Sequence, residues 1–466
     1  MIRALAGLAF ANAAFLVAGA GLVRLFGWRV RSHPGLAYMS GVASVGVIST
    51  LMLIAGLALR GWQVLVLCAL VASLGFVPRG RPAESTGAKM DRRIALPAGG
   101  LLGGYLVVLF VQSVFQPLNS WDAWAKWTMK ARAIVLLGGL DTSVFANHAY
   151  QPLVLDYPML IPALEAMDFR FMGRLDNLVI HVQFWLLLVG FIVAAYELLR
   201  DRVPQMLLWP SLLLVGTAPA LATNLTSAYG DAPVAFFFGL AAIAGWRWLA
   251  TGERRALWFL GLIGGAAVAT KPEGSPFVLG LFLLLAIFML VRRKSLLPLL
   301  APAVWCLIAI VPWRLWISHH GIRSSTPIGK GLDPSYLVDR FDRVWPSIRS
   351  LVDKSFDGDW LAILPLALAV GVVVLGWRRS RSAPLFAGGV LAVVFLSLLW
   401  AYWVQRPGLH YLLSTSGSRT VTTLVVVGGL FLPVLGGELL RSYTGRDERR
   451  DQGGPPPARV RAGAGP

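Results

Sequence analysis

The segment SWDAWAKWTMKAR, residues 120–132, brings one carboxylate together with three tryptophans and three cations. On an α-helix, at about 100° per residue, the tryptophans fall on one side, and Asp122, Lys126, Met129 and Lys130 fall on the other. Such a helix is expected to lie in a membrane interface, with its indoles among the headgroups and its charges toward water. A carboxylate held at that depth could act as a general base on a lipid-borne substrate.

The same spacing has a simpler interpretation. Asp122 and Lys126 are four residues apart, so they could form an ordinary ion pair on a helix that serves only as an anchor. The local pattern leaves both interpretations open.

Further acids occur near the predicted ends of apolar runs. In HAYQPLVLDYPMLIPALEAM, residues 148–167, Asp156 and Tyr157 stand at the entry of a short apolar helix, and Asp231 begins a later apolar run. Each acid could stabilise a helix N-terminus, through capping or the helix dipole. Alternatively, both could line the same cavity as Asp122.

Cations gather near the same predicted boundary. Lys271 and Glu273 share the tight turn TKPEG, and PWRLWISHHGIR and LHYLLSTSGSRTV supply Arg314, His410 and Arg419. Long basic side chains at helix ends can simply reach toward water. Facing a cavity, they would suit a phosphate headgroup.

Composition places these residues in a membrane protein. The 466-residue chain is 56% hydrophobic and 14% charged, with a mean hydropathy of +0.67, which is typical of an all-α polytopic membrane protein. The net charge of +19 resides largely in short loops, which indicates membrane topology and no nucleic-acid partner. Cys68 and Cys306 lie inside apolar runs and suggest neither a disulfide nor a metal site. No nucleotide-binding motif is present.

The length rule for a bilayer predicts about thirteen transmembrane helices. They are expected near 2–23, 37–59, 61–78, 95–115, 178–199, 205–223, 229–250, 255–270, 274–292, 296–317, 360–377, 384–405 and 419–440. Every second loop is short and basic, which places those loops, and a disordered tail at 446–466, in the cytoplasm. The outer side then carries the loops 116–177, 318–359 and 406–418, the first of them with interfacial helices. Gly99, Gly100, Gly103 and Gly104 are spaced for close helix packing.

Six segments together resemble a known superfamily. In chain order they are WDAWAKWTMKAR (121–132), LDYPMLIPALEA (155–166), SAYGDAPVAFF (227–237), TKPEG (270–274), PWRLW (312–316) and LLSTSGSR (412–419). Their order and shared outer location resemble the GT-C superfamily of integral membrane glycosyltransferases. The bacterial branch that includes protein O-mannosyltransferases and lipid A aminoarabinose transferases is the most similar. The resemblance covers roughly 95–420 within a core of 95–445, and the three helices in 1–94 are extra to it.

The resemblance implies a GT-C fold in a bacterial inner membrane, with the active site on the periplasmic face. Asp122 corresponds to the catalytic base of that superfamily, and the implied reaction is inverting transfer of a sugar from a polyprenyl-phosphate donor. The acceptor would be a glycan, lipid or protein, without a metal or other cofactor. Lys271 and Arg419 are expected to stabilise the leaving phosphate. The expected substrate-binding set is completed by Lys126, Asp156, Tyr157, Asp231, Glu273, Arg314 and His410, although the family often has His-Pro-Pro where this chain has Asp156-Tyr157-Pro158.

Two other classes remain open. A transporter or lipid flippase would also have many spans, but internal repeats and polar residues near mid-membrane would be expected, and the sequence shows neither. An O-antigen ligase or polymerase would also use outer arginines and a histidine. In that case Asp122 would be dispensable, which separates the two enzyme hypotheses.

Overall fold

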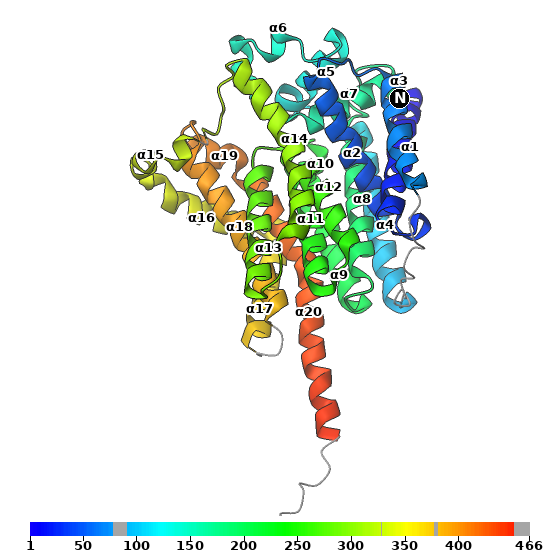
Figure 1. The fold of residues 1–466 in the computed structure, drawn as a ribbon, viewed down its shortest axis with the longest axis vertical. Helices are drawn as coiled ribbons and strands as arrows, with labels where there is room; N and C mark the ends of the chain where they lie inside the picture. Colours follow the sequence, from blue (N-terminus) through cyan, green and yellow to red (C-terminus); the bar gives the residue numbers. More distant parts are fainter. Residues whose placement is uncertain (78–90, 328, 377–380, 452–466) are drawn as a thin grey trace, which may run out of the picture.

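The computed structural model describes residues 1–77, 91–327, 329–376 and 381–451, and within these ranges the regular elements are all helices (Figure 1). This confirms the all-α prediction. Nine helical segments there are long and apolar enough to cross a membrane. They are α1 (Ile2–Leu25), α2 (Pro34–Ile54), α4 (Arg92–Phe115), α8 (His181–Leu199), α11 (Asp231–Thr251), α13 (Gly274–Val291), Leu297–His319 with η5 (Leu297–Leu299) and α14 (Leu300–His319), α18 (Ser382–Val404), and Leu409–Arg441 with α19 (Leu409–Thr420) and the start of α20 (Thr422–Asp451).

A tenth candidate span is broken. α9 (Gln205–Thr217) and α10 (Pro219–Thr226) meet at an angle of 49°. The break lies where Pro219 follows Ala218, because proline lacks the N–H that would continue the helix and restricts the residue before it. The other predicted spans correspond to the shorter helices α3 (Gly61–Ser73), α12 (Arg254–Thr270) and α17 (Ile363–Gly376), so a count of thirteen stays a prediction.

The first helices pack into the same core as the rest. α1 and α2 approach so closely that a Cβ on Gly19 would lie 1.7 Å from the Ala37 carbonyl oxygen, and α2 also contacts α8 and α12. The close packing predicted for α4 holds at Gly99, where a Cβ would lie 3.5 Å from the Trp209 ring on α9, and is wrong at the other three glycines. A Cβ on Gly100, Gly103 or Gly104 would meet no described atom within 4 Å, because α4 lies at the edge of the bundle with most of its surface exposed.

An ionic network ties together the end of the bundle where α11 finishes. Arg247 is 3% exposed, and its guanidinium donates to both oxygens of Asp201, at 2.8 and 2.9 Å, and to Glu253 at 3.1 Å. It also donates to the Leu198 carbonyl. The network therefore joins α8, α11 and the start of α12, and it fixes α11, whose first residue, Asp231, lies at the opposite end.

Short helices cover that opposite end. They are η3 (Asp122–Thr128), α5 (Met129–Leu137), α6 (Thr142–Phe145), η4 (His148–Leu153) and α7 (Leu160–Met172). A second group follows α14, namely η6 (Lys330–Leu332), α15 (Pro334–Val338), η7 (Phe341–Arg343), α16 (Val344–Ser355) and η8 (Gly358–Trp360). The remaining turns are η1 (Val30–Ser32) and η2 (Leu74–Phe76). α20 continues to Asp451, and 452–466, most of the predicted disordered tail, lie outside the described residues.

Candidate functional site

The Asp122 segment is not the α-helix that its spacing predicts. Residues 122–128 form one stretch of π-helix before α5 begins at Met129. In a π-helix the hydrogen bonds run from i to i+5, so successive side chains are rotated relative to an α-helix. Trp121 and Trp124 stay exposed and pack edge to face, with ring centroids 4.7 Å apart, but Trp127 is buried. The predicted three-tryptophan face is therefore wrong at Trp127.

Trp127 is accommodated by a glycine on a neighbouring element. A Cβ on Gly230, just before α11, would lie 2.8 Å from the Trp127 indole. Any side chain at Gly230 would push the indole away. This close contact joins the π-helix to the start of α11, and so places Asp122 near Asp231.

Lys130 was expected on the polar face, but it is fully buried. Its Nζ donates to the Val154 carbonyl at 2.7 Å and lies within about 6 Å of the rings of Trp127 and Tyr157. Val154 has a φ of 47°, a left-handed conformation that is strained for a β-branched residue. Burial lowers the pKa of Lys130 to about 7. Lys130 therefore supports the wall on which Val154 and Tyr157 lie.

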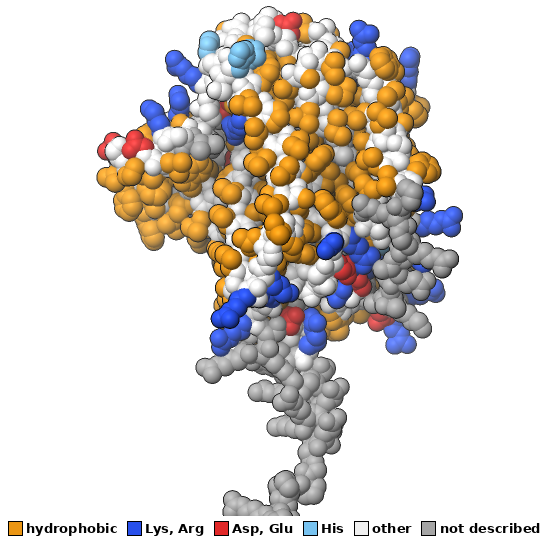
Figure 2. Space-filling model, in the orientation of Figure 1, with side chains coloured by type: hydrophobic (Ala, Val, Ile, Leu, Met, Phe, Trp, Pro, Cys, Tyr) orange, Lys and Arg blue, Asp and Glu red, His pale blue; other side chains and the backbone are white. Residues whose placement is uncertain are grey.

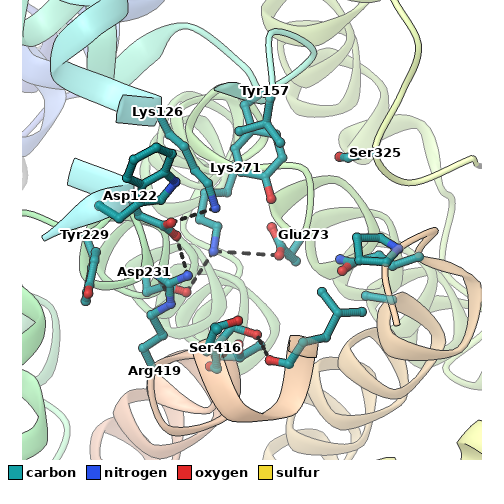
Figure 3. Close-up of a pocket in the computed structure, with 18 of the residues that line it drawn as sticks. Asp122, Lys126, Tyr157, Tyr229, Asp231, Lys271, Glu273, Ser325, Ser416 and Arg419 are labelled. Atoms are coloured by element: carbon teal, nitrogen blue, oxygen red, sulfur yellow. Dashed lines mark hydrogen bonds and ion pairs between the residues drawn. The ribbon is translucent and has the colours of Figure 1, made fainter. Parts of the chain in front are cut away.

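These elements enclose a cavity of about 370 Å³ (Figure 3). Its walls come from the π-helix, the segment before α7, the start of α11, the turn between α12 and α13, the end of α18, and α19. Seven of the ten predicted site residues line it, namely Asp122, Lys126, Tyr157, Asp231, Lys271, Glu273 and Arg419.

The charged side chains in the wall form one connected cluster. Asp122 pairs with Lys126 at 2.7 Å and with Arg419, as Figure 3 shows. The predicted i, i+4 ion pair is thus present, but Asp122 has this second, long-range partner as well. The Arg419 Nε lies 4.0 Å from an Asp231 oxygen. Asp231 in turn accepts a hydrogen bond from Lys271 at 2.7 Å.

Lys271 also lies 3.6 Å from Glu273, so three acids and three cations meet among the described residues of the cavity wall. All six side chains are less than one-fifth exposed. Burial alone would lower the pKa of Lys271, but Asp231 and Glu273 outweigh that effect and raise it. Lys271 is therefore charged at neutral pH.

The electrostatics keep Asp122 ionised. Burial alone would raise the pKa of its carboxyl, but the adjacent Arg419 and Lys126 outweigh burial and hold the pKa below its ordinary value. A carboxylate in this state is a weak base, because the same cations that stabilise its charge also oppose proton uptake.

The other three predicted residues are not part of the cavity wall. Asp156 is buried, and one of its oxygens accepts hydrogen bonds from Ser324 and from the backbone and side chain of Ser325 at 2.9–3.1 Å. Asp156 therefore anchors the loop after α14 that contains Ser324 and Ser325. It does not cap α7, whose N-cap is Met159. Arg314 lies on α14 outside the lining, and His410 is an exposed residue in the first turn of α19.

The structure adds two aromatic residues that sequence reasoning missed. The Arg419 guanidinium lies 4.4 Å from the ring centre of Tyr229, a cation–π contact that holds it in place. The Tyr402 hydroxyl bonds to Ser416 at 3.2 Å and Thr420 at 3.0 Å on α19. Tyr229 lies two residues before Asp231, a signal that could have been used, whereas Tyr402 is inside an apolar run without any signal.

Glu165 and Asp168 on α7 were also missed. Both are buried, and none of their carboxyl oxygens has a hydrogen-bond partner among the described residues. Burial raises the pKa of Glu165 to about 8 and that of Asp168 well above its ordinary value. Glu165 is therefore expected to be uncharged at neutral pH, and α7 packs against the π-helix that carries Asp122.

Replacement of Glu165 by glutamine should change how stability depends on pH. The pKa of Glu165 is about 8 in the folded state and 4.5 in the unfolded state. The contribution of the protonated carboxyl to stability is therefore fully present below pH 4.5, and it is lost as the pH rises to about 8. Glutamine has no proton to lose. The free energy of unfolding of Glu165→Gln, relative to that of the wild type, should therefore rise by up to ~1.4 kcal/mol per pH unit between pH 4.5 and pH 8. Thermal unfolding of the detergent-solubilised proteins at pH 5–8 measures this. A difference that stays constant with pH would contradict it, and exposed Asp141→Asn is the control.

No protein-family profile, curated protein sequence or solved structure matches this chain. Within the described ranges, no three His, Cys, Asp or Glu side chains are grouped as metal ligands. The site must therefore be interpreted from its own geometry.

Proposed function

We propose that the protein is a membrane glycosyltransferase that moves a sugar from a polyprenyl-phosphate donor to an envelope glycan, lipid or protein. One observation carries this proposal: Asp122 shares a cavity wall with Arg419, Lys126 and Lys271. A base and a group of cations are what this transfer needs. The base removes the proton from an acceptor hydroxyl, and the cations stabilise the phosphate as it leaves.

The location of the cavity also supports a lipid-borne substrate. α11 begins at the cavity with Asp231, and α18 ends there with Ala401 and Tyr402, so the cavity lies where two candidate spans meet their loops. A phosphate headgroup could enter there while its polyprenyl chain stays in lipid. The proposed setting is the inner membrane of a bacterium, with the cavity on the periplasmic face and the C-terminus in the cytoplasm. The basic loops at the other end of the bundle favour this orientation.

The pairing of Asp122 with Arg419 suggests how the base is activated. A guanidinium binds phosphate oxygens at least as readily as a carboxylate. When the donor phosphate binds, Arg419 would move its hydrogen bonds from Asp122 to that phosphate. Asp122 would then lose its strongest stabilising partner and become more basic at the moment when a hydroxyl needs deprotonation. The acceptor oxygen attacks the anomeric carbon, the bond from that carbon to the phosphate oxygen breaks, and the proton goes to Asp122.

A transporter remains the second candidate because of the broken α9–α10 helix, since broken helices form the substrate sites of many transporters. The residues of that break do not line the cavity described above. The charged cluster lies at one end of the bundle, where two candidate spans meet their loops, and this favours the glycosyltransferase hypothesis over a transporter with its site near mid-membrane.

The direct test is complementation of cells that lack this protein. Wild type and Asp122→Asn are expressed to equal levels in the membrane, and envelope glycans and polyprenyl-linked sugars are analysed by mass spectrometry. The expected result is that one sugar is missing from an envelope acceptor in the deletion strain, that its polyprenyl-phosphate donor accumulates, and that only wild type reverses both. If Asp122→Asn restores everything, Asp122 is only an ion-pair partner, and the ligase and transporter hypotheses regain priority.

A further inference from the structure

The helices that follow α14 form a lobe beside the bundle, here defined as residues 330–356. Figure 1 shows α15 and α16 at the left of the bundle, beside α18 and α19. The lobe is firmly attached to the end of α18. Arg340 and Arg343 each donate to the Gln405 carbonyl at 2.9 Å, and the Tyr336 hydroxyl donates to the Val404 carbonyl at 2.9 Å. These bonds satisfy carbonyls that the end of a helix otherwise leaves free.

One face of the lobe is apolar and largely exposed, although Phe341 packs edge to face against Trp403 of α18, with ring centroids 6.0 Å apart. On α16, Trp345 and Val352 are seven residues apart and Phe356 follows four later, so the three share one side of the helix. Trp345 is 71% exposed, and Phe341 just before the helix is 65% exposed. Figure 2 shows hydrophobic side chains gathered along the lower side of this lobe, in the orientation of Figure 1.

The adjoining side of α16 is polar, at about 40° to 80° around the helix axis from Trp345. Arg349 and Asp353 are paired at 3.8 Å and are 77% and 65% exposed. Figure 2 shows acidic side chains at the upper edge of the lobe. α16 is therefore amphipathic: Leu351 packs into the protein, while Trp345 and Val352 on the neighbouring part of the apolar arc stay exposed. A helix of this type lies in the plane of a membrane interface, with the apolar side in lipid.

We propose that the apolar face of the lobe is immersed in the lipid leaflet at the cavity end of the bundle. The occupant of this face is the glycerol and upper acyl-chain region of bilayer phospholipids. Continuity favours lipid, because the lobe is bonded to the end of α18, a candidate span with its own exposed apolar residues Leu385 and Leu396. The polar side carries both signs of charge, so insertion depends on apolar contact and does not require anionic lipid.

This immersion fixes the depth of the cavity wall. α16 packs against α18 and α19, and a Cβ on Gly417 of α19 would lie 3.5 Å from the Ser350 hydroxyl. Arg419 follows Gly417 on the same helix. Contact of the lobe with lipid would therefore hold α19, and with it the Arg419 guanidinium, at the depth of the lipid headgroups. The lipid contact itself does not rest on the proposed enzymatic function, although its value for headgroup binding does.

Depth measurement by spin labelling tests the proposal. Single cysteines are introduced as Trp345→Cys on the apolar face and Asp353→Cys on the polar face, and each is labelled with a nitroxide in full-length protein in phosphatidylcholine nanodiscs. The native Cys68 and Cys306 are buried, and the protein without an added cysteine measures any background labelling. The label at 345 should be relaxed mainly by oxygen, which partitions into lipid, and the label at 353 mainly by a water-soluble nickel chelate. Val352→Cys repeats the test on the same face if Trp345→Cys does not fold.

Two results would overturn the proposal. Equal access of the nickel chelate to both faces would place the lobe in water. Strong dipolar coupling between labels at 345 on different molecules, with exclusion of both relaxants, would show that a second copy of the chain covers the face. Neither readout involves turnover, so loss of the glycosyltransferase hypothesis would leave this result unchanged.

Discussion

Under the proposed function, Asp122→Asn is expected to lower the rate of sugar transfer by about 10²- to 10⁴-fold, the range that one general base contributes. Binding of the anionic donor should stay the same or tighten, because Arg419 and Lys126 lose their carboxylate partner and are freed for the phosphate. The measurement pairs single-turnover transfer with binding of a polyprenyl phosphate to purified protein in nanodiscs. A purely structural ion pair predicts the reverse pattern, with weaker folding and little selective loss of turnover.

The control for Asp122→Asn is Asp141→Asn. Asp141 lies in the same predicted outer loop, where its carboxylate caps the short helix α6 at an exposed position. This change should leave both transfer and donor binding as in wild type. Turnover by Asp122→Asn at more than about a tenth of the wild-type rate would exclude it as the base.

Lys271→Met is expected to destabilise the protein by about 3–5 kcal/mol, the usual cost of removing one partner from a buried ion pair. Lys271 is 10% exposed and its partner Asp231 is 8% exposed, so Asp231 would keep a buried charge with only Arg419, at 4.0 Å, to offset it. Thermal unfolding in detergent and the yield of folded protein measure the effect. The exposed control Arg349→Met, which breaks a pair on the lobe, should cost under about 1 kcal/mol.

A second variant separates folding from function at this pair. Lys271→Met combined with Asp231→Asn removes both charges of this pair, so part of the lost stability should return, while Glu273, 3.6 Å from Lys271, still lacks its cation. Sugar transfer should not return, because the cation that we propose faces the leaving phosphate is still missing. Recovery of transfer in the double variant would show that Lys271 serves only the fold.

Much of the site could be predicted because buried charge is rare in a membrane chain. Lys271, Arg419 and Asp231 each interrupt or begin an apolar run, and such residues in a membrane protein need a partner. The sequence therefore identifies these residues without stating their pairs. Asp122 and Arg419 are 297 positions apart, so their contact depends on how α19 packs beside the π-helix, which no local pattern encodes.

The errors have local physical causes. The residue types in 122–128 do not distinguish a π-helix from an α-helix. The directions in which Trp127 and Lys130 point could therefore not be predicted from their spacing. Asp156 has the sequence features of a helix cap, but its partners Ser324 and Ser325 are 168 and 169 residues away. The glycines of α4 suit close packing, yet whether a glycine meets another helix depends on which face the bundle covers.

The equal number of acids and cations in the cavity wall has a consequence for the turnover cycle. Under the proposed reaction, a donor phosphodiester with one negative charge becomes a phosphate monoester with up to two, while Asp122 gains a proton. The total charge in the cavity therefore stays constant through the chemical step. Once Asp122 releases its proton to solvent, its carboxylate competes again for Arg419 and displaces the spent lipid phosphate. Asp122, which accepts the proton, would thus also control the rate of product release. Slower release of the lipid phosphate at low pH would be the kinetic evidence for this role.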